Sequence, residues 1–206
     1  MTIRRNPLNP IVAGVAALSL ALSANSTLAE PKSYKIDEEH LSITFEVNHL
    51  GYASVIGLFL EGKGQFEYDE ETNEVPSGKV VIQSASVFSN HDKRDEHLRK
   101  EDFLHSDRYP EITFEVTDFE TTGERTGNLT GDLTLLGQTR PVTLDVTLNK
   151  AAEYPIGHKE YTLGISASTT IKRSDWGMTY ALDPLMVADD VHLRFEFEAI
   201  QDEGWF

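Results

Sequence analysis

The feature that most constrains the fold is a period of two in hydrophobicity, which runs through most of the chain after Tyr34. In the segment 191–197, Val, Leu and two Phe residues alternate with His, Arg and Glu. The same alternation recurs in the segments 43–47, 58–68, 112–116, 129–135, 142–148 and 163–171. Successive side chains of a strand point to opposite faces, so this pattern indicates antiparallel strands with one buried and one solvated face. The sequence therefore predicts an all-β protein.

The lengths of the strands and the turns between them favour a closed barrel of about eight strands. The run Gly137–Pro141 is a tight turn signal between two well-patterned strands, which we expect to pair as a hairpin. Several strands are long, and long strands would leave open edges in a sandwich, whereas a barrel has none. Gly62 and Gly64 lie on the expected inner face and suit sharp bends at a barrel corner.

One segment breaks the alternation and predicts a short surface helix near residues 90–104. Ser89 and Asp92 have the spacing of a capping box, so we expect Ser89 to cap the helix. Asp95 and Arg99 form an acid-before-base pair four residues apart, which supports an exposed helix. The expected apolar contacts of the helix are few: Leu98, Phe103 and Leu104. We therefore expect the helix to lie on the barrel rather than inside it.

Residues 1–29 have the pattern of a secretory signal peptide. They contain no acidic residue, Arg4 and Arg5 precede an apolar run too short to span a bilayer, and Thr27 and Ala29 supply the small residues of a cleavage site. A membrane anchor or a buried helix is the alternative. Cleavage after Ala29 would leave residues 30–206 as a single exported domain, and we expect it in the periplasm.

Charge and cysteine content exclude several classes of function. The net charge of −16 argues against nucleic-acid binding and against docking on anionic lipid headgroups, since both need an excess of Lys and Arg. The chain has no Cys, which removes disulfides, thiolate metal sites, Cys nucleophiles and a lipoprotein anchor. No stretch beyond the N-terminal segment approaches 18 apolar residues, so we do not expect an integral membrane protein.

No catalytic or metal-binding motif stands out. His91, Asp92, Asp95 and His97 could in principle ligate a metal, but the two histidines would point to different sides of a helix. The many carboxylates allow a glycoside hydrolase, although ordinary surface solvation explains them. We expect no catalytic residue, no metal site and no cofactor.

The apolar inner face is the remaining candidate site. A barrel of eight strands is either filled by side chains or just wide enough for one slender ligand. Small residues on the inner face favour a cavity: Gly62, Gly64, Gly131, Ala167 and Ala199. From the alternation, the residues expected to line the lumen are Phe45, Val47, Leu58, Leu60, Phe66, Phe114, Val116, Leu133, Leu144, Ile165, Ala167 and Phe195.

Several motifs resemble those of the YceI (UPF0312) family of exported bacterial proteins. They are Tyr34-Lys-Ile-Asp37, Phe45-Glu-Val-Asn-His49-Leu-Gly51, Arg94-Asp-Glu-His97-Leu98-Arg99, Tyr109-Pro110-Glu-Ile112-Thr-Phe114, Gly131-Asp-Leu-Thr-Leu135 and Asp175-Trp-Gly177. They occur in family order and span nearly all of the chain after the N-terminal segment. The resemblance implies a closed antiparallel lipocalin-like barrel in the periplasm, without catalytic residues. It also implies a lumen that accepts a polyisoprenoid chain, such as an isoprenoid quinone or a prenyl phosphate.

The leading hypothesis is therefore a non-enzymatic periplasmic protein that binds a long isoprenoid lipid for carriage, storage or a stress response. A carrier of a fatty acid or fatty amide would use the same tube. A filled barrel that binds a protein partner through its acidic surface is a second class, and a hydrolase of lipid or glycan is the third. The sequence leaves the oligomeric state open, with a homodimer as one candidate.

The signal-peptide pattern predicts that the exported protein begins near Glu30. N-terminal sequencing of protein recovered from the periplasm measures this directly. A sequence that starts at Met1 or Thr2 would contradict it.

Overall fold

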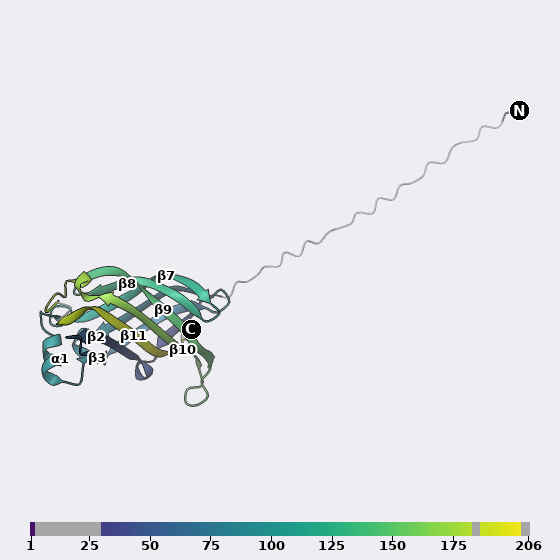
Figure 1. Ribbon diagram of the computed structural model, residues 1–206. Helices are drawn as coiled ribbons and strands as arrows, with labels where there is room; N and C mark the ends of the chain where they lie inside the picture. Colours follow the sequence, from purple (N-terminus) through teal and green to yellow (C-terminus); the bar gives the residue numbers. More distant parts are fainter. Residues whose placement is uncertain (3–29, 183–185, 203–206) are drawn as a thin grey trace.

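The chain folds into a β-barrel with a short helix at one end (Figure 1). The computed structural model describes residues 1–2, 30–182 and 186–202. Apart from its first two residues, the predicted signal peptide lies outside the described residues, so its cleavage stays a prediction. In the described part of the chain, no helix is long and apolar enough to cross a membrane.

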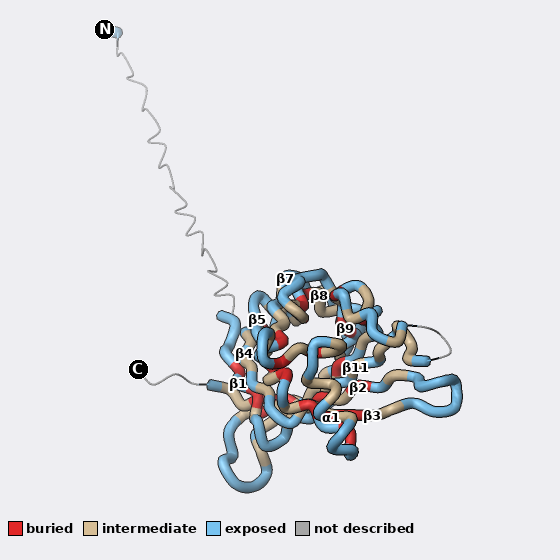
Figure 2. Tube along the Cα trace, turned by 90° about the vertical axis from the view of Figure 1, so that its left-hand side faces the viewer, coloured by how far each residue is buried: buried red, intermediate tan, exposed pale blue. Residues whose placement is uncertain are grey.

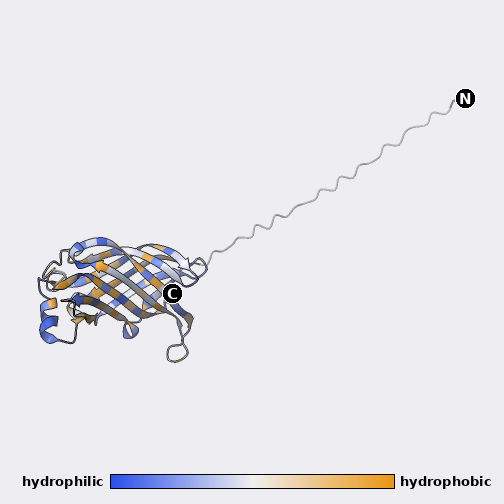
Figure 3. Cartoon of the chain, in the orientation of Figure 1, coloured by the Kyte–Doolittle hydropathy of each residue, from blue (hydrophilic) through white to orange (hydrophobic). Residues whose placement is uncertain are grey.

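The described residues contain eleven strands and one α-helix. The strands are β1 (Lys32–Ile36), β2 (Ser42–His49), β3 (Ala53–Phe59), β4 (Gly62–Asp69), β5 (Glu74–Gln83), β6 (Val87–Phe88), β7 (Glu111–Gly123), β8 (Thr126–Leu135), β9 (Gln138–Glu153), β10 (Tyr161–Lys172) and β11 (Val187–Gln201). The helix α1 spans Asp92–Leu98, and 3₁₀ segments span Glu38–His40, Ser84–Ser86 and Arg173–Trp176. Hydrophilic and hydrophobic residues alternate along the strands in Figure 3, as a wall with one buried face requires.

Eight of these strands form a closed antiparallel ring. Their order is β1–β4–β5–β7–β8–β9–β10–β11, and β1 pairs again with β11 to complete the circle. The predicted hairpin is present, because β8 and β9 pair from Leu135↔Gln138 to Thr126↔Thr147. The prediction of a closed all-β barrel of about eight strands is confirmed.

The other three strands, β2, β3 and β6, extend the barrel wall at the end where α1 lies. β2 pairs with β11, β3 pairs with β2, and β6 pairs with β3. They continue β1, β4 and β5 after short breaks in those strands. Within the described residues β6 has no ladder with β7. Leu98 and Leu104 pack into the core here, so α1 and the loop after it cover this end of the barrel.

Two hydrophobic clusters lie toward the two ends of the barrel. The cluster at the α1 end contains Trp176, whose ring Nε1 donates to the carbonyl oxygen of Leu133. The cluster at the opposite end is centred on Tyr34, Tyr68 and Leu163. Figure 2 looks at the barrel from its α1 end, with buried stretches along the wall strands and exposed loops projecting from them.

The helix differs from its prediction in length and in its N-cap. It is seven residues long, and Nδ1 of His91 accepts a hydrogen bond from the backbone N–H of Arg94. The prediction that Ser89 caps the helix is wrong. The backbone N–H and the hydroxyl of Ser89 instead donate to the carboxylate of Asp95, a residue that is only 4% exposed.

Arg99 also has partners other than the predicted one. Its guanidinium donates to the carbonyl oxygens of Ala85 and Val87, which follow β5. Its predicted partner Asp95 is held by Ser89 instead. These bonds tie α1 to the break between β5 and β6, so the helix covers the barrel end rather than lying loosely on its outer wall.

Replacing Ser89 by Ala should lower the free energy of unfolding by about 2 kcal/mol, because a hydrogen bond to a buried carboxylate is lost. Urea unfolding measures this change. His91→Ala, which removes the observed cap, is the comparison and should cost about 1 kcal/mol. A Ser89→Ala variant as stable as the parent would contradict the buried Ser89–Asp95 bond.

Candidate functional site: the barrel lumen

Three cavities lie in series inside the barrel. The middle cavity has a volume of about 130 Å³ and is lined mainly by β5 and β7 to β11. The helix-side cavity, also of about 130 Å³, lies beneath α1. The far cavity, of about 60 Å³, lies beside the β7–β8 turn. The walls of the middle and helix-side cavities are apolar throughout.

Shared wall residues show that the cavities are neighbours. The partition between the middle and helix-side cavities consists of Ile82, Ile112, Leu133, Leu193 and Phe195. The partition between the middle and far cavities consists of Phe66, Val75, Phe119, Val146 and Ile165. The cavities therefore share walls, and joining them into one tube would require the partition side chains to change rotamer.

Ten of the twelve residues predicted to line the lumen lie in the wall of the middle or the helix-side cavity. Phe45 and Val47 line the helix-side cavity, and Leu133 and Phe195 belong to its partition. The other six line the middle cavity: Phe66, Phe114, Val116, Leu144, Ile165 and Ala167. Their positions follow from the alternation of their strands. Their contact with a ligand stays a prediction.

Leu58 and Leu60 lie elsewhere, and the prediction that they face the lumen is wrong. On β3 the neighbouring residue Phe59 lines the helix-side cavity. Since adjacent side chains of a strand point to opposite faces, Leu58 points outward. Leu60 is 64% exposed. The break between β3 and β4 shifts the alternation by one residue, and Phe66 on β4 faces inward.

The predicted small residues do not in general create the cavities, contrary to the sequence argument. A Cβ at Gly131 would overlap the ring of Phe114, and one at Gly64 would meet Ile36. Neighbouring side chains thus fill the space beside these glycines, as aromatic rings often do in curved sheets. Of the predicted small residues, Ala167 lines the middle cavity.

Sequence reasoning missed several lumen residues, including the partition residues Val75 and Phe119. Val80 and Ile82 on β5 line the middle cavity, but the apolar Val81 between them hides the alternation. The helix-side cavity is also lined by Leu98, Phe103, Leu104 and Met178. Leu98, Phe103 and Leu104 could have been predicted to face the barrel interior, because a helix with few apolar residues packs them against the core.

Hydrogen-bonded tyrosines surround the end of the barrel opposite α1. The hydroxyls of Tyr34 and Tyr161 donate to the two carboxylate oxygens of Glu70, at 3.0 and 2.9 Å. The hydroxyl of Tyr68 donates to Oδ1 of Asn73 at 2.9 Å. Burial and the nearby Glu70 carboxylate raise the pKa of Tyr34, so its phenol stays protonated as a donor. These bonds fix the side chains that block this end.

The histidine cluster considered as a metal site is divided among other partners. Nδ1 of His91 accepts from the backbone of Arg94, and the Asp95 carboxylate accepts from Ser89. Nε2 of His97 lies 2.8 Å from Oδ2 of Asp102. Each of these side chains therefore has a structural role around α1.

A different group of candidate ligands comes together outside the lumen. Ligand atoms of Asp37, His40 and Glu198 lie within 4.8 Å of one another. Nδ1 of His40 lies 2.6 Å from Oδ2 of Asp37, and this hydrogen bond raises the pKa of His40 and lowers that of Asp37. The sequence could not indicate this group, because Glu198 joins the other two only when β11 pairs with β1.

Comparison with known proteins identifies related sequences and structures. The family model of the YceI-like domain matches residues 34–199. A UPF0312 protein of Serratia proteamaculans is 38% identical over 196 residues, which cover 94% of this chain and 98% of that protein. Protein YceI of Shigella flexneri is 37% identical over 192 residues, covering 92% of this chain and 97% of the relative.

Solved structures show the same barrel. The YceI protein of Campylobacter jejuni is 29% identical with a TM-score of 0.69, and the match covers 76% of this chain and 90% of that one. A polyisoprenoid binding domain from Saccharophagus degradans has a TM-score of 0.61 at 15% identity. That match covers 83% of this chain and 99% of the domain, and it supports the fold.

Replacing Ala167 by Phe tests whether the middle cavity has free volume. We expect the free energy of unfolding to change by less than about 1 kcal/mol, because the ring enters the cavity. Urea unfolding measures this, with Ser168→Phe on the outer face of the same strand as the control. A loss of about 1–3 kcal/mol confined to Ala167→Phe would indicate overpacking of a filled core.

Proposed function

Because this chain belongs to the YceI-like family, we propose that it is a non-enzymatic periplasmic protein that holds a long isoprenoid lipid in its lumen. The ligand class is an isoprenoid quinone or a prenyl phosphate. The Saccharophagus degradans structure is described as a polyisoprenoid binding domain, which supports this ligand class for the shared fold. The lipid is a ligand to be carried or stored, and no catalytic step or cofactor is part of the proposal.

The observation that carries the proposal is the row of three neighbouring cavities, of which the two larger have apolar walls. The two larger ones, of about 130 Å³ each, are close in size to a dry engineered cavity of about 150 Å³ that binds benzene. A prenyl unit has five carbons, so each larger cavity accepts about one unit without rearrangement. A narrow series of such spaces suits a linear hydrocarbon better than a compact ligand.

Binding energy then depends on how much of the chain is buried. A buried methylene contributes about 0.8 kcal/mol, so three prenyl units contribute about 12 kcal/mol. Association costs of about 4–15 kcal/mol are subtracted from this. A longer buried chain is therefore needed for firm binding, which requires the partition side chains to move. A straight fatty acyl chain is the alternative occupant, because the apolar walls contain little to distinguish headgroups.

The test is denaturing mass spectrometry of an organic extract from protein purified from its native host. We expect a prenyl lipid in an amount comparable to the protein. The Ala167→Phe variant should carry at least about tenfold less, because a filled middle cavity removes at least one prenyl unit of burial. Ser168→Phe should carry as much as the parent. Parent protein with only straight-chain lipid would favour the fatty-acid alternative, and parent protein without lipid would contradict both.

A further inference from the structure

A stretch without charge lies at the α1 end of the barrel. Residues 48–60 contain no Asp, Glu, Lys or Arg, although such residues make up 25% of the chain. This stretch includes the end of β2, the β2–β3 turn and all of β3. The absence of charge is therefore concentrated in one hairpin of a strongly acidic protein.

The tip of this hairpin places apolar side chains in water. Tyr52 is 92% exposed, and Leu50 is exposed as well. Leu50 and Gly51 both have positive φ, 56° and 71°, within the three-residue turn 50–52 that joins His49 of β2 to Ala53 of β3. A leucine pays a steric penalty in this conformation that glycine avoids.

A second turn with leucine and glycine at positive φ supplies the contrast. Leu136 and Gly137 also have positive φ, and they join β8 to β9. The side chain of Leu136 packs against the hydrophobic cluster at the α1 end, which offsets its strained backbone. Leu50 has the same backbone strain without comparable burial. The exposed side chain of Leu50 is therefore a candidate for contact with a partner outside the barrel.

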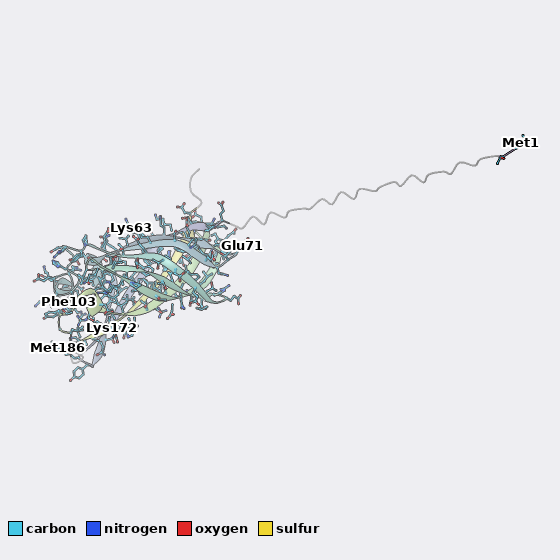
Figure 4. The ribbon with its side chains drawn as sticks, turned by 90° about the horizontal axis from the view of Figure 1, so that it is seen from above. Met1, Lys63, Glu71, Phe103, Lys172 and Met186 are labelled. Atoms are coloured by element: carbon cyan, nitrogen blue, oxygen red, sulfur yellow. The ribbon has the colours of Figure 1, made fainter. Side chains whose placement is uncertain are left out.

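A neighbouring segment adds further apolar side chains to this tip. The backbone N–H of Leu50 donates to the carbonyl oxygen of Met186 at 2.7 Å. We call five exposed residues of this region the apolar rim: Leu50, Tyr52, Tyr180, Leu182 and Met186. In Figure 4, Met186 and Phe103 lie at one end of the barrel and Glu71 at the other.

The apolar rim adjoins the lumen. The ring of Tyr180 packs edge-on against those of His97 and Phe103, with centroids 5.2 and 5.4 Å apart. Phe103 lines the helix-side cavity. One aromatic contact therefore connects the exposed rim to the interior of the barrel.

We propose that the apolar rim inserts into the boundary between headgroups and acyl chains of a lipid bilayer, and that the ligand passes between bilayer and lumen beside α1. This inference rests on the proposed function, because a long prenyl lipid has to be exchanged with a membrane. Tyrosine is enriched at that boundary, where its ring is apolar and its hydroxyl remains hydrated. The five rim residues carry no charge, so their insertion avoids the desolvation cost of burying ionised groups.

The negative charge of the protein determines which headgroup charge of the bilayer favours binding. With a net charge of −16, the protein is repelled by anionic headgroups, so insertion must depend on apolar contact rather than on ionic attraction. Binding is therefore expected to be strongest on zwitterionic phosphatidylcholine vesicles and to weaken as anionic lipid is added.

Flotation of the exported protein with phosphatidylcholine vesicles tests the insertion. The double variant Leu50→Ser/Tyr52→Ser should bind at least about tenfold more weakly, because two large apolar side chains are lost. Ile156→Ser is the matched control, since Ile156 is 72% exposed in the β9–β10 loop outside the rim. Equal flotation of the parent and the double variant, or flotation that requires anionic lipid, would overturn the proposal. The proposal would also be overturned if the parent failed to float and self-associated, and the double variant no longer self-associated. In that case the rim would be a contact between two copies of this chain.

A second measurement separates this proposal from the function on which it rests. Each protein is offered a prenyl alcohol either dissolved with mild detergent or incorporated in vesicles. The double variant should load as well as the parent from detergent. From vesicles it should load at least about tenfold more slowly, because the substitutions that weaken flotation also slow transfer from the bilayer. If the parent fails to load from detergent, the lumen proposal fails, while flotation still decides the insertion. Equal loading of both proteins from vesicles would overturn the exchange route.

Discussion

The pairing of β1 with β11 is the contact on which the rest of the structure depends. It joins residues that are far apart in the chain, with Tyr34 opposite Gln201 and Ile36 opposite Ala199. Without it the strands would form an open sheet with two unpaired edges and no enclosed space. The chain has no Cys, so this closure rests on ladder hydrogen bonds and on the packing of the completely buried Tyr34, Leu163 and Ala199.

Closure is not uniform along the barrel, and the difference gives its two ends separate roles. At the end marked by Tyr34 the ring is complete, and tyrosine hydroxyls bonded to Glu70 hold the blocking side chains. At the other end the wall continues from β1, β4 and β5 into β2, β3 and β6, and within the described residues β6 has no ladder with β7. The gap is covered by α1 and its loop, through side chains rather than a ladder. Side chains change rotamer far more readily than ladder bonds break, so under the proposed function we expect the ligand to exchange beside α1.

The sequence predicted the wall where strands are continuous and failed where they break. The alternation placed Phe114, Leu133 and Ile165 correctly, because a strand preserves its phase between bulges. It gave no sign of Phe119, which lines the lumen after a bulge in β7. It misplaced Leu58 and Leu60, since a break of two residues reverses the phase and no local signal marks it. The cap of α1 failed for a related reason. A capping motif describes local bonds, whereas Ser89 is held by the buried carboxylate of Asp95. The cavities themselves depend on which side chains meet across the barrel, which period and composition do not determine.

The polarity of the lumen also fixes the direction in which a prenyl lipid would enter under the proposed function. The walls of the helix-side and middle cavities offer no hydrogen-bond partner, and burying an unpaired polar group costs about 2–7 kcal/mol. A phosphate or quinone headgroup that entered first would bear this cost along both cavities. A lipid that enters tail first leaves its headgroup beside α1, near Tyr180 and the exposed His97–Asp102 pair. In that orientation the headgroup never leaves the level of the bilayer headgroups while the rim is inserted, and only hydrocarbon moves between bilayer and barrel.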